Sequence, residues 1–259
     1  MTDKMQVNLR QVAMEILYEV QKNNGLLHVV LSDALKKYQY LDKNERSFIS
    51  RLVQGTEERK IELDYIIDSF SKTPVKKQKD VIRIILEMSV YQLKYMDSVP
   101  ASAVCNEAVK LAVKKNFGTL RGFVNGVLRN ISRNKEVIHY PDPEKTPAAY
   151  LSMRYSVPEW LAEMWLRDYG FEMTAEMGQA MLDDQKTTVR VRDSQNMAAV
   201  KEALRSEGLN IEEGCMLPEA LHLSGYDYLG NVGPFADGRI TAQDESAMLA
   251  AVAAGIAGG

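Results

Sequence analysis

Apolar residues recur every three or four positions through residues 1–140, the spacing that places them on one face of a helix. Helix start signals accompany this pattern, as at Asn8 before the first apolar run and in the capping-box pair Asp42 and Glu45. The expected helices cover residues 8–24, 27–38, 42–70 with a division near Gly55, 81–95, 102–115 and 119–134, the last capped by Thr119. We therefore predict an all-α bundle of six or seven helices.

The pattern changes after the segment His139 to Pro147, which holds three of the eight prolines and is expected to be a linker. Ser156, with Glu159 three residues later, is expected to cap a helix that ends at Gly170. Short alternating segments then predict strands at residues 187–193, 221–223 and 239–241, with a helix capped by Asn196 after the first strand. The fold class that follows is mainly α, a helical bundle followed by a small α/β domain.

Charge divides the chain in the same region. Residues 1–140 carry 23 Lys and Arg against 16 Asp and Glu, whereas residues 141–259 carry 9 against 19. A basic first module suggests a polyanionic partner, and drift in surface composition is the alternative. The N-terminus has no apolar leader, and the two cysteines are far apart in sequence. These features suggest a cytoplasmic protein without a membrane partner.

The strongest candidate for binding is the stretch of residues 108–135, which contains no acidic residue. Its basic side chains lie on two successive helices and can converge near the connecting turn, where they would neutralise phosphates. The candidate RNA-binding residues are Arg10, Lys110, Lys114, Lys115, Arg121, Arg129 and Arg133. Phe117 and Phe123 are the only aromatic residues in the stretch, so recognition through backbone and shape is favoured over stacking of many bases. A solvated helix face is the other interpretation.

Catalytic machinery is not evident in the sequence. The histidines His28, His139 and His222 are isolated from one another, and Cys105 and Cys215 have no histidine nearby in sequence. We therefore expect no catalytic, cofactor-binding or metal-binding residue in this chain, and free thiols at both cysteines.

The first 135 residues resemble the NusB-type RNA-binding fold of bacterial antitermination factors. Matching stretches run in order along the chain, from Leu9-Arg10 through the sequence LVQGT at residues 52–56. The most specific combination is YQL at residues 91–93, NEAVKLA at residues 106–112 and FVNGVLR at residues 123–129.

The chain continues with RYSVPEWL at residues 154–161, then GPF at residues 233–235 and QDES at residues 243–246. This continuation resembles the RsmB (Sun/Fmu) branch of ribosomal RNA cytosine-C5 methyltransferases. That branch joins a NusB-like domain to a small α/β domain and a Rossmann-like S-adenosylmethionine domain. The resemblance covers essentially the whole chain, and one departure is Val157, where the family commonly has histidine.

The resemblance implies docking of 16S ribosomal RNA for methylation with S-adenosylmethionine. In the family, the QDES helix, capped here by Asp244, is followed by a strand and a Cys-Ala-Ala-Pro-Gly-Gly-Lys cofactor loop, and two further motifs supply cysteines. None of these motifs occurs in the 259 residues, so neither cysteine receives a catalytic role. We expect the turn into that strand to begin at Gly258-Gly259. The chain alone is then expected to bind no S-adenosylmethionine and to be inactive.

The expected organisation is a NusB-like domain, a Pro-rich linker, a small α/β domain and the truncated start of the methyltransferase domain, at residues 1–138, 139–150, 151–235 and 236–259. The expected function is the RNA-binding N-terminal part of a 16S rRNA (cytosine-C5) methyltransferase. One alternative is a stand-alone, non-catalytic NusB-like transcription antitermination factor. Another is a helical protein-binding module whose basic face is only solvated.

Overall fold

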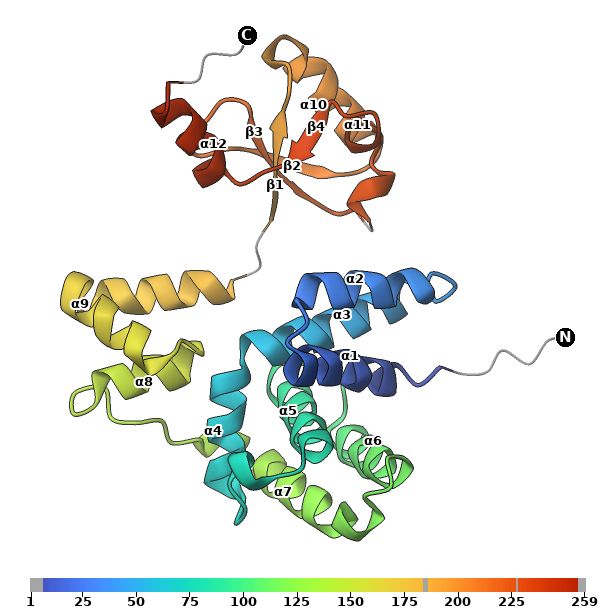
Figure 1. The fold of residues 1–259 in the computed structure, drawn as a ribbon, viewed down its shortest axis with the longest axis vertical. Helices are drawn as coiled ribbons and strands as arrows, with labels where there is room; N and C mark the ends of the chain where they lie inside the picture. The colour runs from blue at the N-terminus through green and yellow to red at the C-terminus, as the bar shows by residue number, and fades with distance from the viewer. Residues whose placement is uncertain (1–6, 184–185, 227, 256–259) are drawn as a thin grey trace, which may run out of the picture. The chain divides into compact units, whose positions relative to one another are not determined.

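A computed structural model describes residues 7–183, 186–226 and 228–255, which form two units that divide after Asp183 (Figure 1). Each unit is considered by itself. In the described residues, no helix has the length and apolar character needed to cross a membrane.

The predicted all-α bundle is confirmed in the first unit. Its seven α-helices up to residue 134 are α1 (Leu9–Asn23), α2 (Leu27–Lys37), α3 (Lys43–Glu58), α4 (Lys60–Phe70), α5 (Asp80–Tyr95), α6 (Ala101–Lys114) and α7 (Arg121–Asn134). Short 3₁₀ turns lie between them at η1 (Val75–Lys77), η2 (Gly118–Leu120) and after α7 at η3 (Lys135–Val137). The core is closed by aliphatic side chains with no exposed surface, such as Leu17, Ile49, Leu52, Leu63, Ile66 and Ile85.

Two of the predicted helix starts are confirmed by their hydrogen bonds. The Asn8 side chain accepts from the Gln11 backbone N–H at 2.9 Å. Asp42 and Glu45 form both bonds of the capping box, at 2.8 and 3.1 Å. The predicted Thr119 cap is wrong, because η2 occupies residues 118–120 and the N-cap position of α7 is Leu120.

The predicted division near Gly55 is also wrong, because α3 continues through this glycine and the break falls at Arg59. The glycine serves packing instead. A Cβ at position 55 would lie 2.1 Å from the ring of Tyr91 on α5, so only glycine lets the two helices approach this closely.

Two further helices, α8 (Pro147–Tyr155) and α9 (Glu159–Leu182), complete the first unit. Gly170, at φ 78°, interrupts α9 as predicted, but the helix resumes after it. The continuation was not predicted, because its apolar residues do not form one stripe. Its small residue Gly178 instead packs against α8, where a Cβ would lie 2.7 Å from the Tyr155 ring.

Ser156 was expected to cap α9, and this is wrong. Ser156 has a left-handed backbone with φ 57° and ends α8, and the N-cap position of α9 is Pro158. The Ser156 hydroxyl accepts instead from the backbone N–H groups of Ile61 and Glu62, at 3.0 and 3.2 Å. It therefore caps α4, almost a hundred residues earlier in the chain.

The expected linker at residues 139–150 lies against the bundle in its first residues and is helical from Pro147. Tyr65 Oη donates to the His139 carbonyl at 2.6 Å, and Tyr140 Oη donates to the buried Glu62 carboxylate. The compact units therefore divide later than this linker. The domain bounds expected from the sequence stay a prediction.

The second unit has the α/β composition predicted for the small domain. It contains β1 (Thr187–Val191), η4 (Ser194–Asn196), α10 (Met197–Ser206), β2 (Asn210–Glu213), β3 (Ala220–Ser224), η5 (Leu229–Asn231), α11 (Gly233–Ala236), β4 (Ile240–Ala242) and α12 (Glu245–Ala253). The strands expected at residues 187–193, 221–223 and 239–241 are confirmed, and β2 was not predicted. The Asn196 side chain makes no capping bond, and Asp193 caps the preceding 3₁₀ turn. Gly258 and Gly259 lie outside the described residues.

The sheet has the order β2-β3-β1-β4, and all neighbouring strands are antiparallel. β1 and β2 are therefore parallel, joined through α10 and separated by β3, which is a split βαβ arrangement. Side chains alternate between the two faces along each strand, so Val189, Val191, Leu221 and Leu223 point into the core that α10 covers. Thr188 and His222, direct partners across β1 and β3, project from the opposite face.

Candidate nucleic-acid interface

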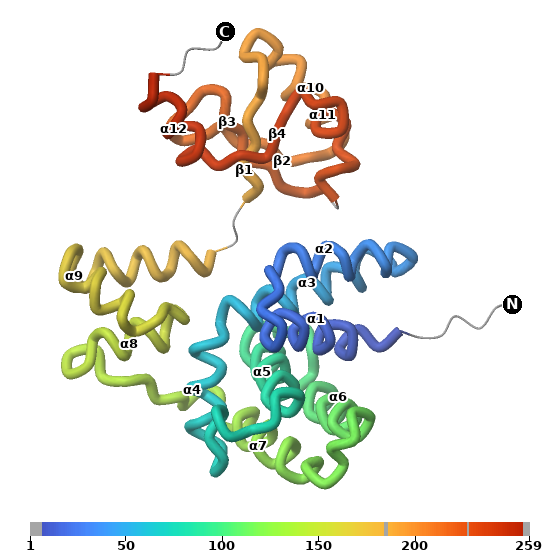
Figure 2. Tube along the Cα trace, in the orientation of Figure 1, coloured from blue at the N-terminus to red at the C-terminus, as the bar shows by residue number. Residues whose placement is uncertain are grey.

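Helices α6 and α7 form a hairpin joined through η2, as the chain trace shows (Figure 2). Their apolar faces are buried in the bundle through Val104, Ala108, Leu111, Ala112, Val124, Val127, Leu128 and Ile131. The basic residues of this stretch fall on the remaining, outward faces because 3.6 residues make one turn.

An open hollow of about 450 Å³ lies between the outward faces of the two helices. Most of its lining residues are basic or carry an amide group, and none is acidic. The lining consists of Asn106, Val109 and Lys110 from α6, with Arg121, Gly122, Asn125 and Arg129 from α7. This surface presents cations and amide groups together, which is the donor set that phosphate and sugar oxygens accept from.

The basic side chains of residues 108–135 differ in whether they have partners within the protein. In the described part of the chain, the side chains of Arg121, Arg129 and Arg133 make no hydrogen bond or ion pair to the protein and are exposed. Lys110 pairs with Glu107 of its own helix at 2.7 Å, and this contact lowers the pKa of Glu107. Lys115 is bound to Glu15 of α1 at 2.7 Å. Arg121 and Arg129 are therefore the cations in the hollow most available to a ligand.

Arg10 lies on α1, outside the hollow lining. Its Nε donates to Gln92 Oε1 at 2.7 Å, and its guanidinium lies 5.2 Å from the ring centroid of Phe48. Burial lowers the pKa of Arg10, although the charge of Glu107 acts in the opposite direction. These contacts give Arg10 a packing role in the bundle, in addition to any contact that it makes with a ligand.

Three glycines at four-residue spacing mark the start of the α7 face. A Cβ added at Gly118, Gly122 or Gly126 would meet nothing within 4 Å. Packing inside the protein therefore does not require these glycines. Gly122 leaves the α7 backbone uncovered in the hollow lining, which permits close approach by a ligand, whereas Gly118 and Gly126 are not part of the lining.

The structure brings together three of the seven residues predicted from sequence, namely Lys110, Arg121 and Arg129. Lys114, Lys115, Arg133 and Arg10 are not part of the lining. Sequence reasoning missed Asn106 and Asn125. Both lie one helical turn from a predicted cation, at 106/110 and at 121/125/129, so an i, i+4 search would have found them.

The cysteines and histidines have different surroundings. Cys105 is buried, and burial raises the pKa of its thiol, so it is a core side chain. Cys215 and His222, which are seven positions apart in sequence, converge with Glu245 in the second unit. Glu245 was not predicted at this place, because it is 30 residues from Cys215 in the sequence.

Two family models match the chain. Residues 7–133 match the NusB family, and residues 157–227 match the ferredoxin-like domain of RsmF/B-like methyltransferases. The split βαβ sheet agrees with the second match, although the matched residues also include the whole of α9 and end before β4.

Among curated relatives, the probable ribosomal RNA small subunit methyltransferase B of Bacillus subtilis is 33% identical over 245 residues, covering 94% of this chain and 54% of the relative. The chain thus spans about half the length of such methyltransferase relatives. The transcription antitermination protein NusB of Ruminiclostridium cellulolyticum is 32% identical over 129 residues, covering 48% of this chain and 86% of the relative. The crystal structure of PH0851 aligns with a TM-score of 0.69 at 16% identity, covering 97% of this chain and 56% of that one, and this likeness concerns the fold alone.

Proposed function

The chain belongs to the NusB family through residues 7–133 and continues into the ferredoxin-like domain of RsmF/B-like methyltransferases, and we propose that it docks 16S ribosomal RNA for a cytosine-C5 methyltransferase. In this proposal it is the RNA-binding N-terminal part of an S-adenosylmethionine-dependent enzyme that acts in the cytoplasm. The relative from Bacillus subtilis supports the proposal through its name, which specifies the small-subunit ribosomal RNA.

The observation that carries the proposal is the hollow between α6 and α7. Its cations Arg121 and Arg129 are unpaired in the described residues, and no carboxylate lines it. A phosphate backbone releases condensed counterions when it meets such a surface, so binding is expected to fall steeply with salt. Phe117 and Phe123 pack against the core, which leaves few rings for base stacking. Structured RNA, contacted through its backbone, is therefore the proposed ligand.

The seven residues predicted from sequence take unequal parts in this proposal. Lys110, Arg121 and Arg129 contact phosphates in the hollow, with Asn106 and Asn125 as further donors. Lys114, Lys115 and Arg133 extend the basic surface along the two helices. Arg10 contributes mainly through its packing against Gln92 and Phe48.

Methyl transfer requires chemistry that these residues do not supply. Attack on C6 of cytosine needs a thiolate nucleophile, and transfer needs a bound sulfonium donor. Cys105 is buried, Cys215 matches neither cysteine motif of the family, and the family's cofactor loop is not among the 259 residues. We propose that the chain by itself binds RNA, binds no S-adenosylmethionine and transfers no methyl group.

A stand-alone NusB-like antitermination factor is the second candidate. The similarity to NusB of Ruminiclostridium cellulolyticum over most of that protein favours it. The match of residues 157–227 to a methyltransferase-associated domain favours the first proposal, because an antitermination factor has no evident need for this domain.

The test is an equilibrium titration of the chain with a 16S ribosomal RNA fragment and with an antitermination-type RNA at several salt concentrations. We expect preferential binding to the ribosomal fragment, with a negative slope of log affinity against log salt. Preference for the second RNA would favour the regulator, and absence of binding to either at low salt would contradict both. Methylation by these residues alone would contradict the proposed inactivity.

A further inference from the structure

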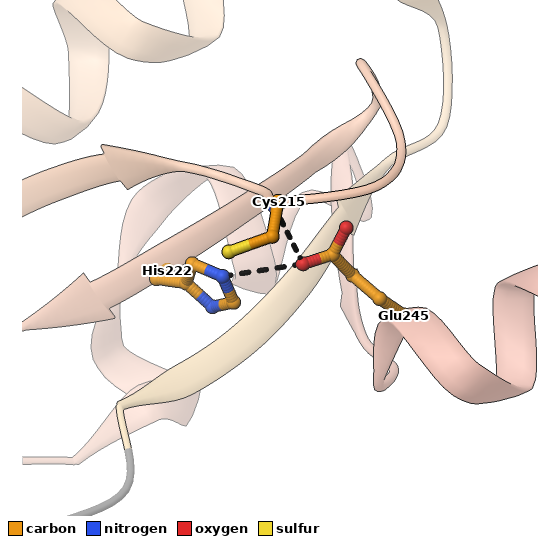
Figure 3. A group of neighbouring side chains, drawn as sticks. All are labelled: Cys215, His222 and Glu245. Carbon is orange, nitrogen blue, oxygen red and sulfur yellow. Dashed lines mark hydrogen bonds and ion pairs between the residues drawn. The ribbon is translucent and has the colours of Figure 1, made fainter.

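Three side chains from three separate segments converge on the outer face of the second unit's sheet. Cys215 follows β2, His222 lies in β3, and Glu245 is the first residue of α12. The thiol, an imidazole nitrogen and a carboxylate oxygen of this group all lie within 4.8 Å of one another. Figure 3 shows the Cys215 thiol beside the His222 ring, with the Glu245 carboxylate directed at both residues. We propose that Cys215, His222 and Glu245 bind a zinc ion.

The imidazole of His222 is oriented as a metal ligand requires. Its Nδ1 lies 3.1 Å from the Thr188 hydroxyl, its direct partner on the neighbouring strand β1. This contact holds the ring so that Nε2 points at Glu245. When Nε2 binds a cation, Nδ1 carries the proton and donates a hydrogen bond to Thr188 Oγ1. A partner of this kind, hydrogen-bonded to the second ring nitrogen, is a general feature of metal-binding histidines.

The carboxylate of Glu245 is held by the backbone around Cys215. It accepts from the N–H groups of Cys215, Met216 and Leu217 at 2.9, 2.7 and 3.0 Å. Gly214 makes room for it, because a Cβ there would lie 2.9 Å from Glu245 Oε2. The carboxylate is therefore preorganised before any ion arrives.

The spacing of the donors suits a tetrahedral ion. Zinc bound at about 2.0–2.1 Å to nitrogen and oxygen places those atoms about 3.4 Å apart. His222 Nε2 and Glu245 Oε1 are 3.2 Å apart. Zinc at about 2.3 Å from sulfur requires roughly 3.6 Å between sulfur and the other donors. Cys215 is exposed, so rotation of its side chain can bring the sulfur to that distance.

The donor set selects the kind of ion. A thiolate and an imidazole favour zinc and other borderline-soft cations over magnesium and calcium, which take oxygen ligands. Thiolate and carboxylate together neutralise a divalent charge. Three protein donors leave a fourth position for water, and the exposed side of Cys215 gives access to it. The ion would tie α12 to the sheet through both β3 and the loop after β2.

The test uses the full chain without a histidine tag, stripped by chelation and kept reduced with a phosphine. Cobalt(II) is titrated in first, because a bound thiolate gives a charge-transfer absorption in the near ultraviolet. Zinc is then added in competition with a chromophoric chelator. We expect one equivalent of cobalt with this absorption, and its displacement by zinc.

Cys215→Ser and His222→Gln are expected to abolish the absorption or to weaken zinc binding by at least about tenfold. Cys105→Ala, which removes the other cysteine, and Glu213→Gln, which removes a neighbouring acid, should leave both readouts unchanged. Circular dichroism confirms that each variant is folded. No thiolate absorption in the wild-type chain, or absorption that survives Cys215→Ser, overturns the proposal. The cluster would then be a hydrogen-bonded contact that holds α12 in place.

Discussion

The hydroxyl of Ser156 accepts a hydrogen bond from the backbone N–H of Ile61 at 3.0 Å. It thereby satisfies a free donor at the start of α4 from a residue that ends α8. A contact between segments this far apart in sequence fastens the α8–α9 extension to the NusB-like bundle.

Replacement of Ser156 tests this tertiary cap. Ser156→Ala removes the acceptor for two N–H groups, and we expect the free energy of unfolding to fall by about 1 kcal/mol. Ser156→Gly removes the same acceptor but relaxes a left-handed backbone with φ 57°. The glycine variant should therefore lose less stability than the alanine variant in denaturant titration. Equal losses would show that the backbone strain contributes nothing.

Replacement of two helical glycines by alanine is expected to change the stability of the protein in opposite directions. Gly55→Ala forces a methyl group into the Tyr91 ring, at 2.1 Å, and should destabilise the protein by roughly 1–3 kcal/mol. Gly126→Ala meets nothing within 4 Å and should stabilise it by about 0.5–1 kcal/mol, because alanine favours helix. Thermal unfolding of the two variants measures whether each substitution lowers or raises the stability. Destabilisation by Gly126→Ala would mean that this glycine has a packing role.

Asp64 belongs to a partly buried cluster of charges between α4 and α5. Its Oδ2 pairs with Lys60 at 2.7 Å, and Lys60 also pairs with the fully buried Glu87 at 2.9 Å. Its Oδ1 is buried without a hydrogen-bond partner among the described residues. Burial, aided by the charge of Glu87, raises the pKa of Asp64 from 3.8 to about 7.

This shift predicts a pH dependence of stability with a definite sign. Between pH 4 and 7 the folded state retains a proton on Asp64 that the unfolded state has released, so the unfolding free energy falls as pH rises. Asp64→Asn should flatten that part of the profile, whereas the exposed control Asp97→Asn should not. An Asp64→Asn profile parallel to the wild type would contradict the raised pKa.

Gly122 tests whether the bare backbone of α7 is used in binding. Gly122 lines the hollow and has open space above it, so Gly122→Ala should fold normally. If an RNA backbone approaches this surface closely, the added methyl group should weaken RNA binding several-fold. Gly126→Ala is the matched control, because it lies one turn further along and does not line the hollow. Equal affinities for both variants and the wild type would exclude close approach at Gly122.

Local patterns predicted the bundle well because its helices are amphipathic and carry their own start signals. Asn8 and the pair Asp42 and Glu45 cap the helices they precede. The failures occurred where a distant partner decides the structure. Gly55 lies inside α3, where it leaves space for Tyr91, and Ser156 caps α4 instead of α9. Neither partner is visible in a local window of sequence.

The resemblance to NusB and RsmB-type proteins is confirmed by both family models. The candidate site was predicted in part. A stretch free of acidic residues indicated the hairpin that forms the hollow and three of its lining residues. The pairing of Lys115 with Glu15 could not be predicted, because it depends on how α6 packs against α1. The convergence of Cys215, His222 and Glu245 depends on sheet register and on the position of α12, which the sequence pattern does not specify.

The proposed RNA surface is tested most directly by a charge-reversed pair, Arg121→Glu with Arg129→Glu, titrated with a 16S ribosomal RNA fragment at low and moderate salt. We expect affinity to fall at least about tenfold and the salt slope to shrink by about 2, because two phosphate contacts are lost. The matched control is Lys37→Glu with Lys43→Glu, which changes the net charge equally on α2 and α3, away from the hollow lining. Equal weakening by both pairs, or unchanged affinity at low salt for the first, would contradict RNA binding in the α6–α7 hollow.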